Sequence, residues 1–369
     1  MRVGASSNWA APRMVDGEGP IRNTNAETWF VTRKYPPRIG GMELLSWELT
    51  TRFAKRRRTR VFSLRHSSLL LPLFLVRCAL SIVAGGTRRR IAILHLGDPV
   101  LAPLGRLAKL FGIPVCVTVH GLDITYPHPM YRIWLRMFFH GFDAYVCISR
   151  ATREAAIASG VPESHTRIVG LGVALPPAAT SEREADLLLF VGRLVRRKGL
   201  EWFVRDVLPK IAERRPAVRL AVVGAGPEGR AIRQAAVAAG VADRIEWLGA
   251  VTHTERASLL LRATVCIAPN VDVPGDVEGY GVVALEAAAS GCALVAADLH
   301  GLRDAIVDGE GGLLIAAGEA DVWARTIVEL LDDSRRAAAL GARARAWALS
   351  ERSWNAVCDR YDDVFNAIA

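Results

Sequence analysis

The 369-residue sequence contains no run of 18 or more uncharged apolar residues, so no transmembrane helix is expected. The nearest candidate, Ser67 to Ala84, is interrupted by Pro72 and Arg77 and fits a buried or interfacial helix better. Residues 1–27 lack the apolar core of a signal peptide, and we expect a disordered extension there, or a start site placed too early. These features predict a cytoplasmic protein.

Paired cysteines are also missing. The six cysteines lie far apart without a CxxC pair, and most of them stand in apolar surroundings. This pattern predicts buried, reduced thiols rather than a disulfide framework or a zinc site.

Two signatures of cofactor chemistry are incomplete. Asp272 and Asp276 are four positions apart in a Pro-Gly loop, which is a poor setting for a metal, so we expect no metal and no other cofactor. In "VVGAGPEG" (222–229) the third glycine has the wrong spacing for a dinucleotide fingerprint, and Pro227 interrupts the motif. Gly224 either contacts a nucleotide sugar or only makes a tight strand-to-helix turn, and both interpretations stay open.

The sequence does have an excess of positive charge. Its net charge of +10 is concentrated between Arg52 and Arg60 and at residues 88–90. Such clusters attract phosphate-bearing partners, either nucleic acid or anionic lipid. A solvated arginine-rich face is the alternative.

Short apolar runs alternate with amphipathic stretches, which predicts an α/β protein made of two Rossmann-like, doubly wound parallel sheets. Strands are expected at 28–33, 60–64, 91–96, 114–120 and 144–149, and again at 187–192, 219–226, 244–249, 263–269, 292–298 and 311–316. The Pro- and Ser-containing stretch at 177–186 is the expected linker between domains at 28–176 and 187–351. A final helix, at 352–369, has an aromatic face and is expected to cross back onto the first domain.

Ligands bind at the carboxyl ends of the strands in such sheets, and two motifs of the second domain lie there. In "GRLVRRKG" (192–199), Arg193 and Lys198 bracket a loop before a helix, where two cations and free backbone N–H groups can hold a diphosphate. The glycines at both ends of the motif would let the backbone approach the anion. Arg196 and Arg197 are expected to be solvated.

The second motif is "EGYGVVALE" (278–286), where Gly279 and Gly281 mark a helix entry. We expect the N–H groups of Val282 and Val283 to be free for phosphate. Glu286, one turn into the helix, can accept two hydrogen bonds from a ribose diol, and Glu278 can bind a sugar hydroxyl. The alternative is a surface glutamate and a loop charge.

These motifs, with "RIGG" at 38–41, resemble the retaining glycosyltransferases of family four over residues 28 to 369. The resemblance implies the GT-B fold, with two Rossmann-like domains facing a central cleft, and a nucleotide-diphosphate sugar held mainly by the second domain without a metal. The catalytic residues it implies are His120, Glu278, Arg193 and Lys198. The donor-binding residues it implies are Gly40, Gly41, Arg193, Lys198, Gly224, Glu278, Gly279, Tyr280, Gly281, Val282, Val283 and Glu286.

Three strand-end residues of the first domain have open roles. His120, followed by Gly121 and Asp123, is expected to face the donor sugar, although a structural histidine is the alternative. His95 either faces the acceptor or is structural. Asp98 is a weaker candidate.

The acceptor is less well defined. Residues 129–143 interleave aromatics with Arg132 and Arg136, which suits either a membrane interface or an ordinary core helix. With the cluster at 52–60, this favours peripheral binding at the inner face of the cytoplasmic membrane. The resemblance implies a GDP- or UDP-linked hexose, often mannose, and a glycan or lipid-linked acceptor in polysaccharide, lipopolysaccharide or glycolipid synthesis.

Three rival hypotheses remain. The first is another GT-B enzyme, such as a nucleotide-sugar epimerase or phosphorylase. The second is a basic protein that binds nucleic acid or membrane and has an inactive cleft. No aromatic-plus-basic strand motif for RNA is present, so no nucleic-acid partner is expected. The third, an NAD-dependent dehydrogenase, is disfavoured by the defective glycine motif.

Overall fold

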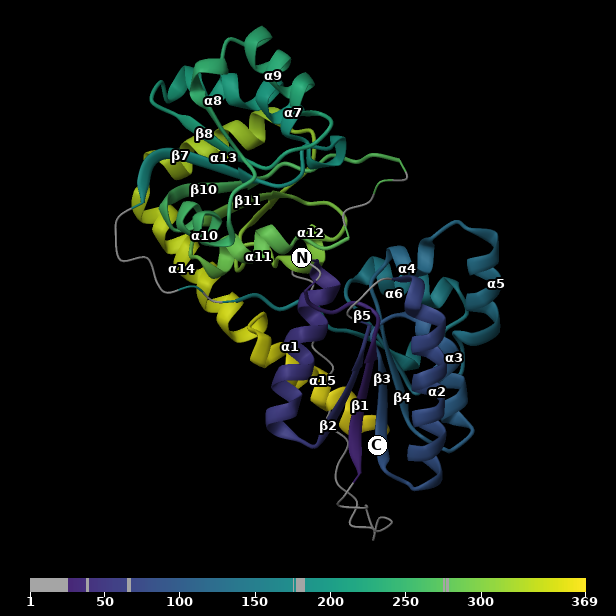
Figure 1. The fold of residues 1–369 in the computed structure, drawn as a ribbon. Helices are drawn as coiled ribbons and strands as arrows, with labels where there is room; N and C mark the ends of the chain where they lie inside the picture. The colour runs from purple at the N-terminus through teal and green to yellow at the C-terminus, as the bar shows by residue number, and fades with distance from the viewer. Residues whose placement is uncertain are drawn as a thin grey trace, which may run out of the picture.

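The computed structural model describes residues 26–37, 40–64, 68–174, 176, 183–274, 276 and 279–369. They form two α/β domains, each built on a six-stranded sheet, which lie one above the other in Figure 1. The predicted pair of doubly wound parallel sheets is confirmed. Glu278, most of the expected linker and residues 1–25 of the expected extension lie outside the described residues.

The first domain has the strand order β2-β1-β3-β4-β5-β6. Its strands are β1 (Glu27–Thr32), β2 (Thr59–Ser63), β3 (Ile91–Leu96), β4 (Val115–Val119), β5 (Ala144–Cys147) and β6 (Thr166–Ile168). Its helices are α1 (Gly41–Arg56), α2 (Leu71–Thr87), α3 (Ala102–Lys109), α4 (Leu122–Thr125), α5 (Pro129–Phe138) and α6 (Arg150–Ala158). The edge strand β6 was not predicted, because it has three residues and two of them are exposed.

The second domain has the strand order β12-β11-β10-β7-β8-β9. Its strands are β7 (Glu184–Val191), β8 (Arg219–Val223), β9 (Ile245–Gly249), β10 (Ala263–Ala268), β11 (Ala293–Ala297) and β12 (Leu313–Ile315). Its helices are α7 (Leu200–Trp202), α8 (Leu208–Arg214), α9 (Gly229–Ala238), α10 (His253–Arg262), α11 (Val282–Ala289), α12 (Leu302–Ala305), α13 (Ala320–Asp332) and α14 (Ser334–Glu351). Strand β7 begins three residues before the expected strand.

The central strands are covered on both faces. All five residues of β4 and of β11 are buried, as the near-continuous apolar sequence of a parallel strand requires. All six cysteines are buried free thiols, so that prediction is confirmed. Among the described residues, no helix combines the length and the apolarity needed to cross a membrane.

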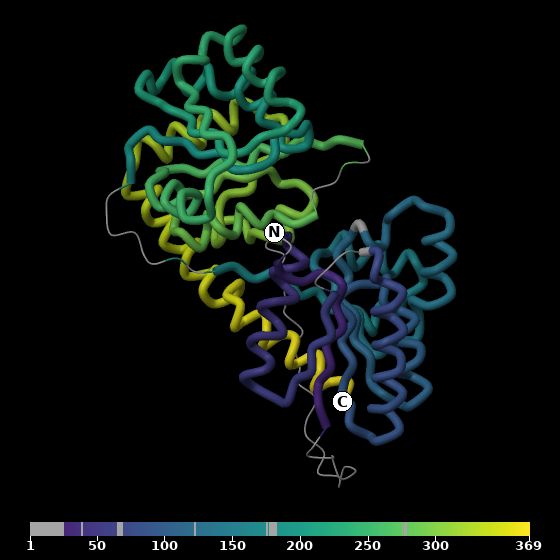
Figure 2. The backbone as a smooth tube through the Cα atoms, viewed as in Figure 1, coloured from purple at the N-terminus to yellow at the C-terminus, as the bar shows by residue number. Residues whose placement is uncertain are grey.

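The chain returns to the first domain at its C-terminus. Figure 2 follows α14 out of the second domain and into α15 (Trp354–Ile368), which lies against the first. The Phe365 ring lies 5.2 Å from that of Phe53 in α1, and Tyr361 Oη lies 2.9 Å from Thr118 Oγ1 in β4. The chain therefore crosses back onto the first domain, and α15 shares an aromatic core with it.

This crossing also changes the interpretation of the basic cluster at 52–60. Arg52 donates to Asn355 at 2.6 Å, Arg56 pairs with Asp359 at 2.6 Å, and Arg57 pairs with Asp362. Three cations of the cluster therefore contact α15 and hold the end of α1 against it. The expectation that the whole cluster serves a phosphate-bearing partner is wrong for these three.

His95 is a core residue, so the acceptor-facing interpretation is wrong. Its Nε2 lies 2.8 Å from Thr118 Oγ1, and its ring packs against Phe30 and Phe365. Burial lowers the pKa of His95 to about 3, which keeps the ring neutral.

Candidate active site

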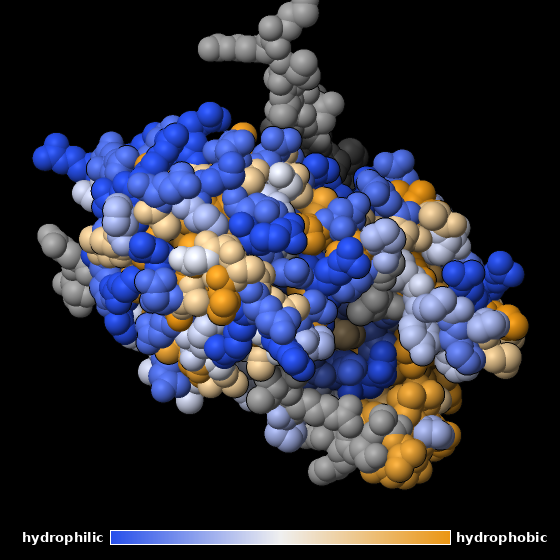
Figure 3. All heavy atoms as spheres, turned by 90° about the horizontal axis from the view of Figure 1, so that it is seen from above, coloured by the Kyte–Doolittle hydropathy of each residue, from blue (hydrophilic) through white to orange (hydrophobic). Residues whose placement is uncertain are grey.

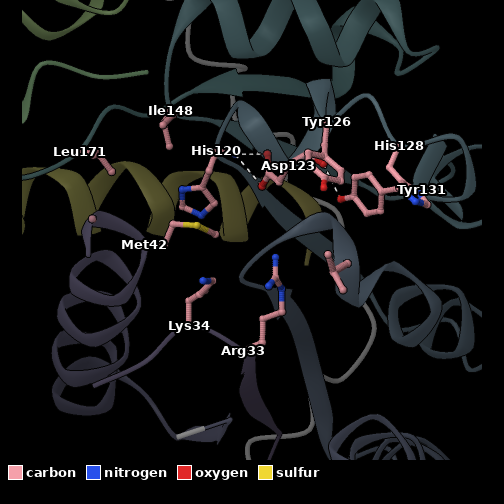
Figure 4. Close-up of a pocket in the computed structure, with 12 residues that line it drawn as sticks. Arg33, Lys34, Met42, His120, Asp123, Tyr126, His128, Tyr131, Ile148 and Leu171 are labelled. Atoms are coloured by element: carbon pink, nitrogen blue, oxygen red, sulfur yellow. Dashed lines mark hydrogen bonds between the residues drawn. The ribbon is translucent and has the colours of Figure 1, made fainter. Parts of the chain in front are cut away.

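A cavity of about 610 Å³ opens at the carboxyl edge of the first sheet. Its lining side chains come from the segments after β1, β3, β4, β5 and β6 and from the start of α1, and Figure 4 draws them. The lining residues are Arg33, Lys34, Gly41, Met42, Val100, His120, Asp123, Tyr126, His128, Tyr131, Ile148 and Leu171. This is the edge at which ligands bind in open α/β sheets.

His120 lines this cavity just after β4, and its ring is held in one orientation. Its Nε2 lies 3.0 Å from the carbonyl oxygen of Gly97, which can only accept, so Nε2 carries the proton. Burial lowers the pKa of His120, although the Asp98 carboxylate opposes the shift. The neutral ring therefore presents Nδ1 as a hydrogen-bond acceptor.

Asp123 fixes the turn that carries His120. Both of its carboxylate oxygens accept from the His120 backbone N–H, at 3.0 and 3.1 Å. Burial raises the pKa of Asp123 to about 7, and the nearby Asp98 adds to the effect. Tyr131 donates its hydroxyl to the Asp123 carbonyl oxygen at 2.5 Å.

The two cations of the cavity, Arg33 and Lys34, were not predicted. Arg33 Nε donates to the buried Asp98 at 2.9 Å, and Lys34 lies 3.7 Å from Glu43. The same oxygen of Asp98 also accepts from the Val100 N–H, while Asp98 Oδ2 is buried with no partner among the described residues. Two basic residues directly after the first strand were the sequence signal that could have indicated them.

Gly40 and Gly41 lie at the start of α1, at the same edge. Gly40 is the residue before the helix, and a side chain there would overlap the Glu43 carboxylate. Gly41 faces open space and lines the cavity. A backbone approach to a ligand is therefore sterically open at Gly41.

Arg193 and Lys198 bracket the loop after β7, as predicted. Arg193 is exposed, and no carboxylate pairs with it in the described part of the chain. The loop backbone is fixed to its neighbour by the Gly192 and Leu194 N–H groups, which donate to Val223 and Ala225 at 3.0 Å each. A fixed loop presents its cation without a reorganisation cost.

The expectation that Arg197 is solvated is wrong. Its side chain is 15% exposed and pairs with Asp276 at 2.7 Å, and its carbonyl oxygen accepts from the Val271 N–H. Gly199 has a packing role in addition to any other, because φ is +68° and a Cβ would lie 1.8 Å from the Pro269 carbonyl oxygen. Arg196 is exposed as expected.

Gly224 serves the turn between β8 and α9. Its φ is +129°, and a Cβ would lie 1.9 Å from the Gly192 carbonyl oxygen. The close approach brings this turn against the Arg193 loop. The structural interpretation is sufficient to explain this glycine.

The entry to α11 differs from the expectation in one respect. The Val282 N–H donates to the Tyr280 carbonyl oxygen at 2.9 Å, so it is not free. For the Val283 N–H, no acceptor is seen among the residues that the structure describes. Tyr280 is buried, and its hydroxyl lies so close to Gly170 that a side chain there would overlap it. Tyr280 thus contacts the first domain rather than an open site.

The other two glycines of the motif are distinct. A Cβ at Gly281 would lie 2.5 Å from Leu302 Cδ2, so this glycine lets α11 pack against α12. Gly279 is exposed with open space around it.

Glu286 is not a solvated surface residue. Its Oε1 accepts from Arg256 Nη2 at 2.8 Å, and its Oε2 is buried with no partner among the described residues. Burial raises the pKa of Glu286, while Arg256 and His253 oppose the shift. A half-satisfied buried carboxylate is costly, which is typical of an oxygen reserved for a ligand.

Glu286 lines a cavity of about 180 Å³ at the junction of the two domains. The walls come from α1, from α10 and α11, and from the segment after β6. The predicted site residues are thus divided: His120 and Gly41 line the larger cavity, Glu286 and Val282 the smaller, and Arg193 and Lys198 line neither. Within the described ranges no cluster of three His, Cys, Asp or Glu residues is placed to hold a metal.

The GT-B class is defined by two α/β domains, each with a parallel sheet, whose ligand-binding strand ends lie at the junction between the domains. The structure is similar to that of HepE from Anabaena in complex with UDP and glucose, with a TM-score of 0.68, 16% identity, and coverage of 92% of this chain and 100% of that one. It is also similar to a glycosyltransferase from Rickettsia africae, with a TM-score of 0.72, 15% identity, and coverage of 93% and 98%. These likenesses show the fold.

The sequence comparisons show the family. Residues 25–175 match the model described as Glycosyltransferase Family 4, and residues 185–333 match that of Glycosyl transferases group 1. The GDP-mannose-dependent alpha-(1-6)-phosphatidylinositol monomannoside mannosyltransferase of Mycolicibacterium smegmatis is 30% identical over 270 residues, 69% of this chain and 70% of that protein. Its counterpart in Mycobacterium tuberculosis is 30% identical over 279 residues, 72% of each chain. This chain belongs to glycosyltransferase family 4 and is a glycosyltransferase.

Proposed function

We propose that this enzyme is a retaining, metal-independent hexosyltransferase that uses GDP-mannose as its donor. The choice of mannose follows the activities for which the two mycobacterial relatives are named. The proposed acceptor is a glycan or lipid-linked polyol, and its proposed place is the 610 Å³ cavity beside His120. Peripheral association with the inner face of the cytoplasmic membrane and a role in polysaccharide, lipopolysaccharide or glycolipid synthesis belong to the same proposal.

The observation that carries the donor site is the buried, unpartnered Oε2 of Glu286. A carboxylate oxygen in that state needs hydrogen-bond donors, and a ribose diol supplies two. Arg256 holds the other oxygen and so sets the orientation of the carboxylate. The remaining donor contacts are proposed for Glu278, Gly279, Val283 and the loop from Arg193 to Lys198.

The loop cations take the leaving-group role. Negative charge grows on the diphosphate as its bond to the anomeric carbon breaks, and a fixed cation stabilises that transition state more than the ground state. Arg193 is exposed on a loop whose backbone is hydrogen-bonded to the next strand, so it suits this role. Charge neutralisation by Arg193 and Lys198 is the reason why no metal is required in this proposal.

His120 is proposed to orient the reacting sugar. Its protonated Nε2 is engaged by Gly97, which leaves Nδ1 to accept a hydrogen bond from a sugar hydroxyl. Asp123 holds the backbone of the same turn. A tyrosine- and histidine-lined cavity next to it offers polar contacts for acceptor hydroxyls.

Product analysis tests the proposal. The protein is incubated with GDP-mannose, a polar-lipid and polyol acceptor panel, and EDTA, and the product is analysed by NMR. An α-mannoside formed in the presence of EDTA is the expected result. A β-linked product, or activity that returns only when Mg²⁺ or Mn²⁺ is added, would contradict the retaining or the metal-independent part, respectively.

A further inference from the structure

Helix α2 exposes an apolar face that nothing in the described structure covers. The exposed large apolar residues on and just before it follow the helical repeat: Leu69, Leu70, Leu73, Val76, Leu80 and Val83. The opposite face, with Phe74, Cys78 and Ile82, is buried against the sheet and α3. A helix that is apolar on all sides is normally buried on all sides. Figure 3 shows apolar side chains gathered at one edge of the molecule.

The polar groups of α2 do not need water. Ser81 Oγ donates to the Arg77 carbonyl oxygen at 2.9 Å, and Thr87 Oγ1 donates to that of Val83 at 3.0 Å. Both hydroxyls are therefore satisfied within the helix. The one charged side chain of the helix, Arg77, is long enough to reach past the apolar face to water.

The charge around this face has a single sign. Residues 64–97, which include α2 and the segments on either side of it, contain five arginines and no lysine, aspartate or glutamate. Arg88, Arg89 and Arg90 are exposed directly after α2, and Arg77 lies in the middle of the exposed face. This surface is complementary to an anionic partner, and it would repel a second copy of itself.

We propose that the exposed face of α2 and its flanking arginines form the surface that docks on an anionic lipid bilayer. The apolar side chains enter the acyl boundary while the arginines contact headgroup phosphates. This rests on the membrane part of the proposed function, and it assigns that part to α2 instead of the basic cluster at 52–60.

The position of α2 in the fold also determines how a membrane-bound acceptor would reach the cavity. The helix starts at the carboxyl edge of the sheet, where the 610 Å³ cavity opens, and runs about 25 Å to the opposite edge. With α2 lying in the interface, the cavity mouth faces along the bilayer surface. A lipid-linked acceptor can then enter without leaving the membrane.

Vesicle co-sedimentation with the full chain tests the surface. The vesicles are phosphatidylcholine alone, or phosphatidylcholine with phosphatidylglycerol, at low and high salt. Leu80→Asp is compared with Val237→Asp, because the two residues are equally exposed, at 67% and 70%, and Val237 lies in the second domain. We expect binding to the phosphatidylglycerol vesicles that weakens with salt, at least a tenfold loss in Leu80→Asp, and no loss in Val237→Asp.

Three results would overturn the assignment. The first is that the wild-type protein does not bind anionic vesicles, and the second is that the two variants bind them equally. The third is that light scattering shows a wild-type dimer which dissociates in Leu80→Asp. Nucleotide-induced thermal stabilisation is measured on the same samples. It reports the donor site, so a failure of docking is distinguishable from a failure of the proposed glycosyl transfer.

Discussion

Replacing Glu286 by glutamine perturbs the proposed ribose contact with almost no change of shape. In the wild-type structure, Glu286 Oε1 accepts a hydrogen bond from Arg256. Its Oε2 is buried with no partner among the described residues. A hydrogen bond to a charged group contributes about 1.5–3 kcal/mol, which corresponds to about 10- to 150-fold in affinity. We therefore expect Glu286→Gln to weaken donor binding by a factor in that range.

The stability of this variant relative to wild type should depend on pH. Burial raises the folded-state pKa of Glu286, so ionisation of the wild-type carboxyl costs folding free energy as the pH rises through that pKa. Glutamine does not pay this cost, but it leaves Arg256 without its counter-charge. The melting temperature of Glu286→Gln relative to wild type should therefore be higher at pH 7 than at pH 4.

The assay is calorimetric titration with GDP and with 2′-deoxy-GDP, or the uridine pair if that base binds. Wild type should prefer the ribose form, and Glu286→Gln should lose most of that preference, because the two changes remove the same interaction. Glu310→Gln, at an exposed position of the same domain, is the control. A Glu286→Gln variant that keeps the wild-type preference for ribose would refute the assignment.

Three further predictions follow from other contacts. Arg193→Ala should lower turnover about 100-fold in a steady-state assay while Arg196→Ala changes it little, and equal effects would contradict the leaving-group role. Phe365→Ala should reduce the free energy of unfolding by about 3–5 kcal/mol in urea titrations, since its ring is fully buried against α1, and a loss below about 1 kcal/mol would argue against the shared core. The pKa of Asp123 is raised to about 7, so its ionisation destabilises the fold as the pH rises. The melting temperature of Asp123→Asn minus that of wild type should therefore increase from pH 5 to pH 8. A melting-temperature difference that does not change with pH would contradict this.

The features that could be predicted from the sequence are those with a local pattern. Runs such as "IAILHL" and "VCVTV" are apolar without alternation, which is the pattern of a strand buried on both faces, and both are strands in the structure. The aromatic face of the last helix likewise requires a partner, and α1 and β4 supply it. His120 was placed at a strand end, and it does line the larger cavity.

The features that could not be predicted depend on pairs distant in sequence. Arg56 and Asp359 are 303 positions apart, so nothing near Arg56 indicates that it is neutralised. His95 and His120 both follow apolar strand residues, and only the packing of α15 shows that the first is enclosed in the core. The sequence also did not indicate that the Val282 N–H is already hydrogen-bonded, to the Tyr280 carbonyl oxygen in a tight turn.

We propose that the chain binds a sugar nucleotide without a metal. Calorimetric titration with GDP-mannose, GDP, UDP-glucose and UDP, all in EDTA, tests it most directly. We expect one-to-one binding of one nucleotide family, which is strongest for the guanine pair and is weakened by Glu286→Gln and Arg193→Ala. Absence of binding by all four compounds, by a protein that is folded in the same buffer, would contradict it.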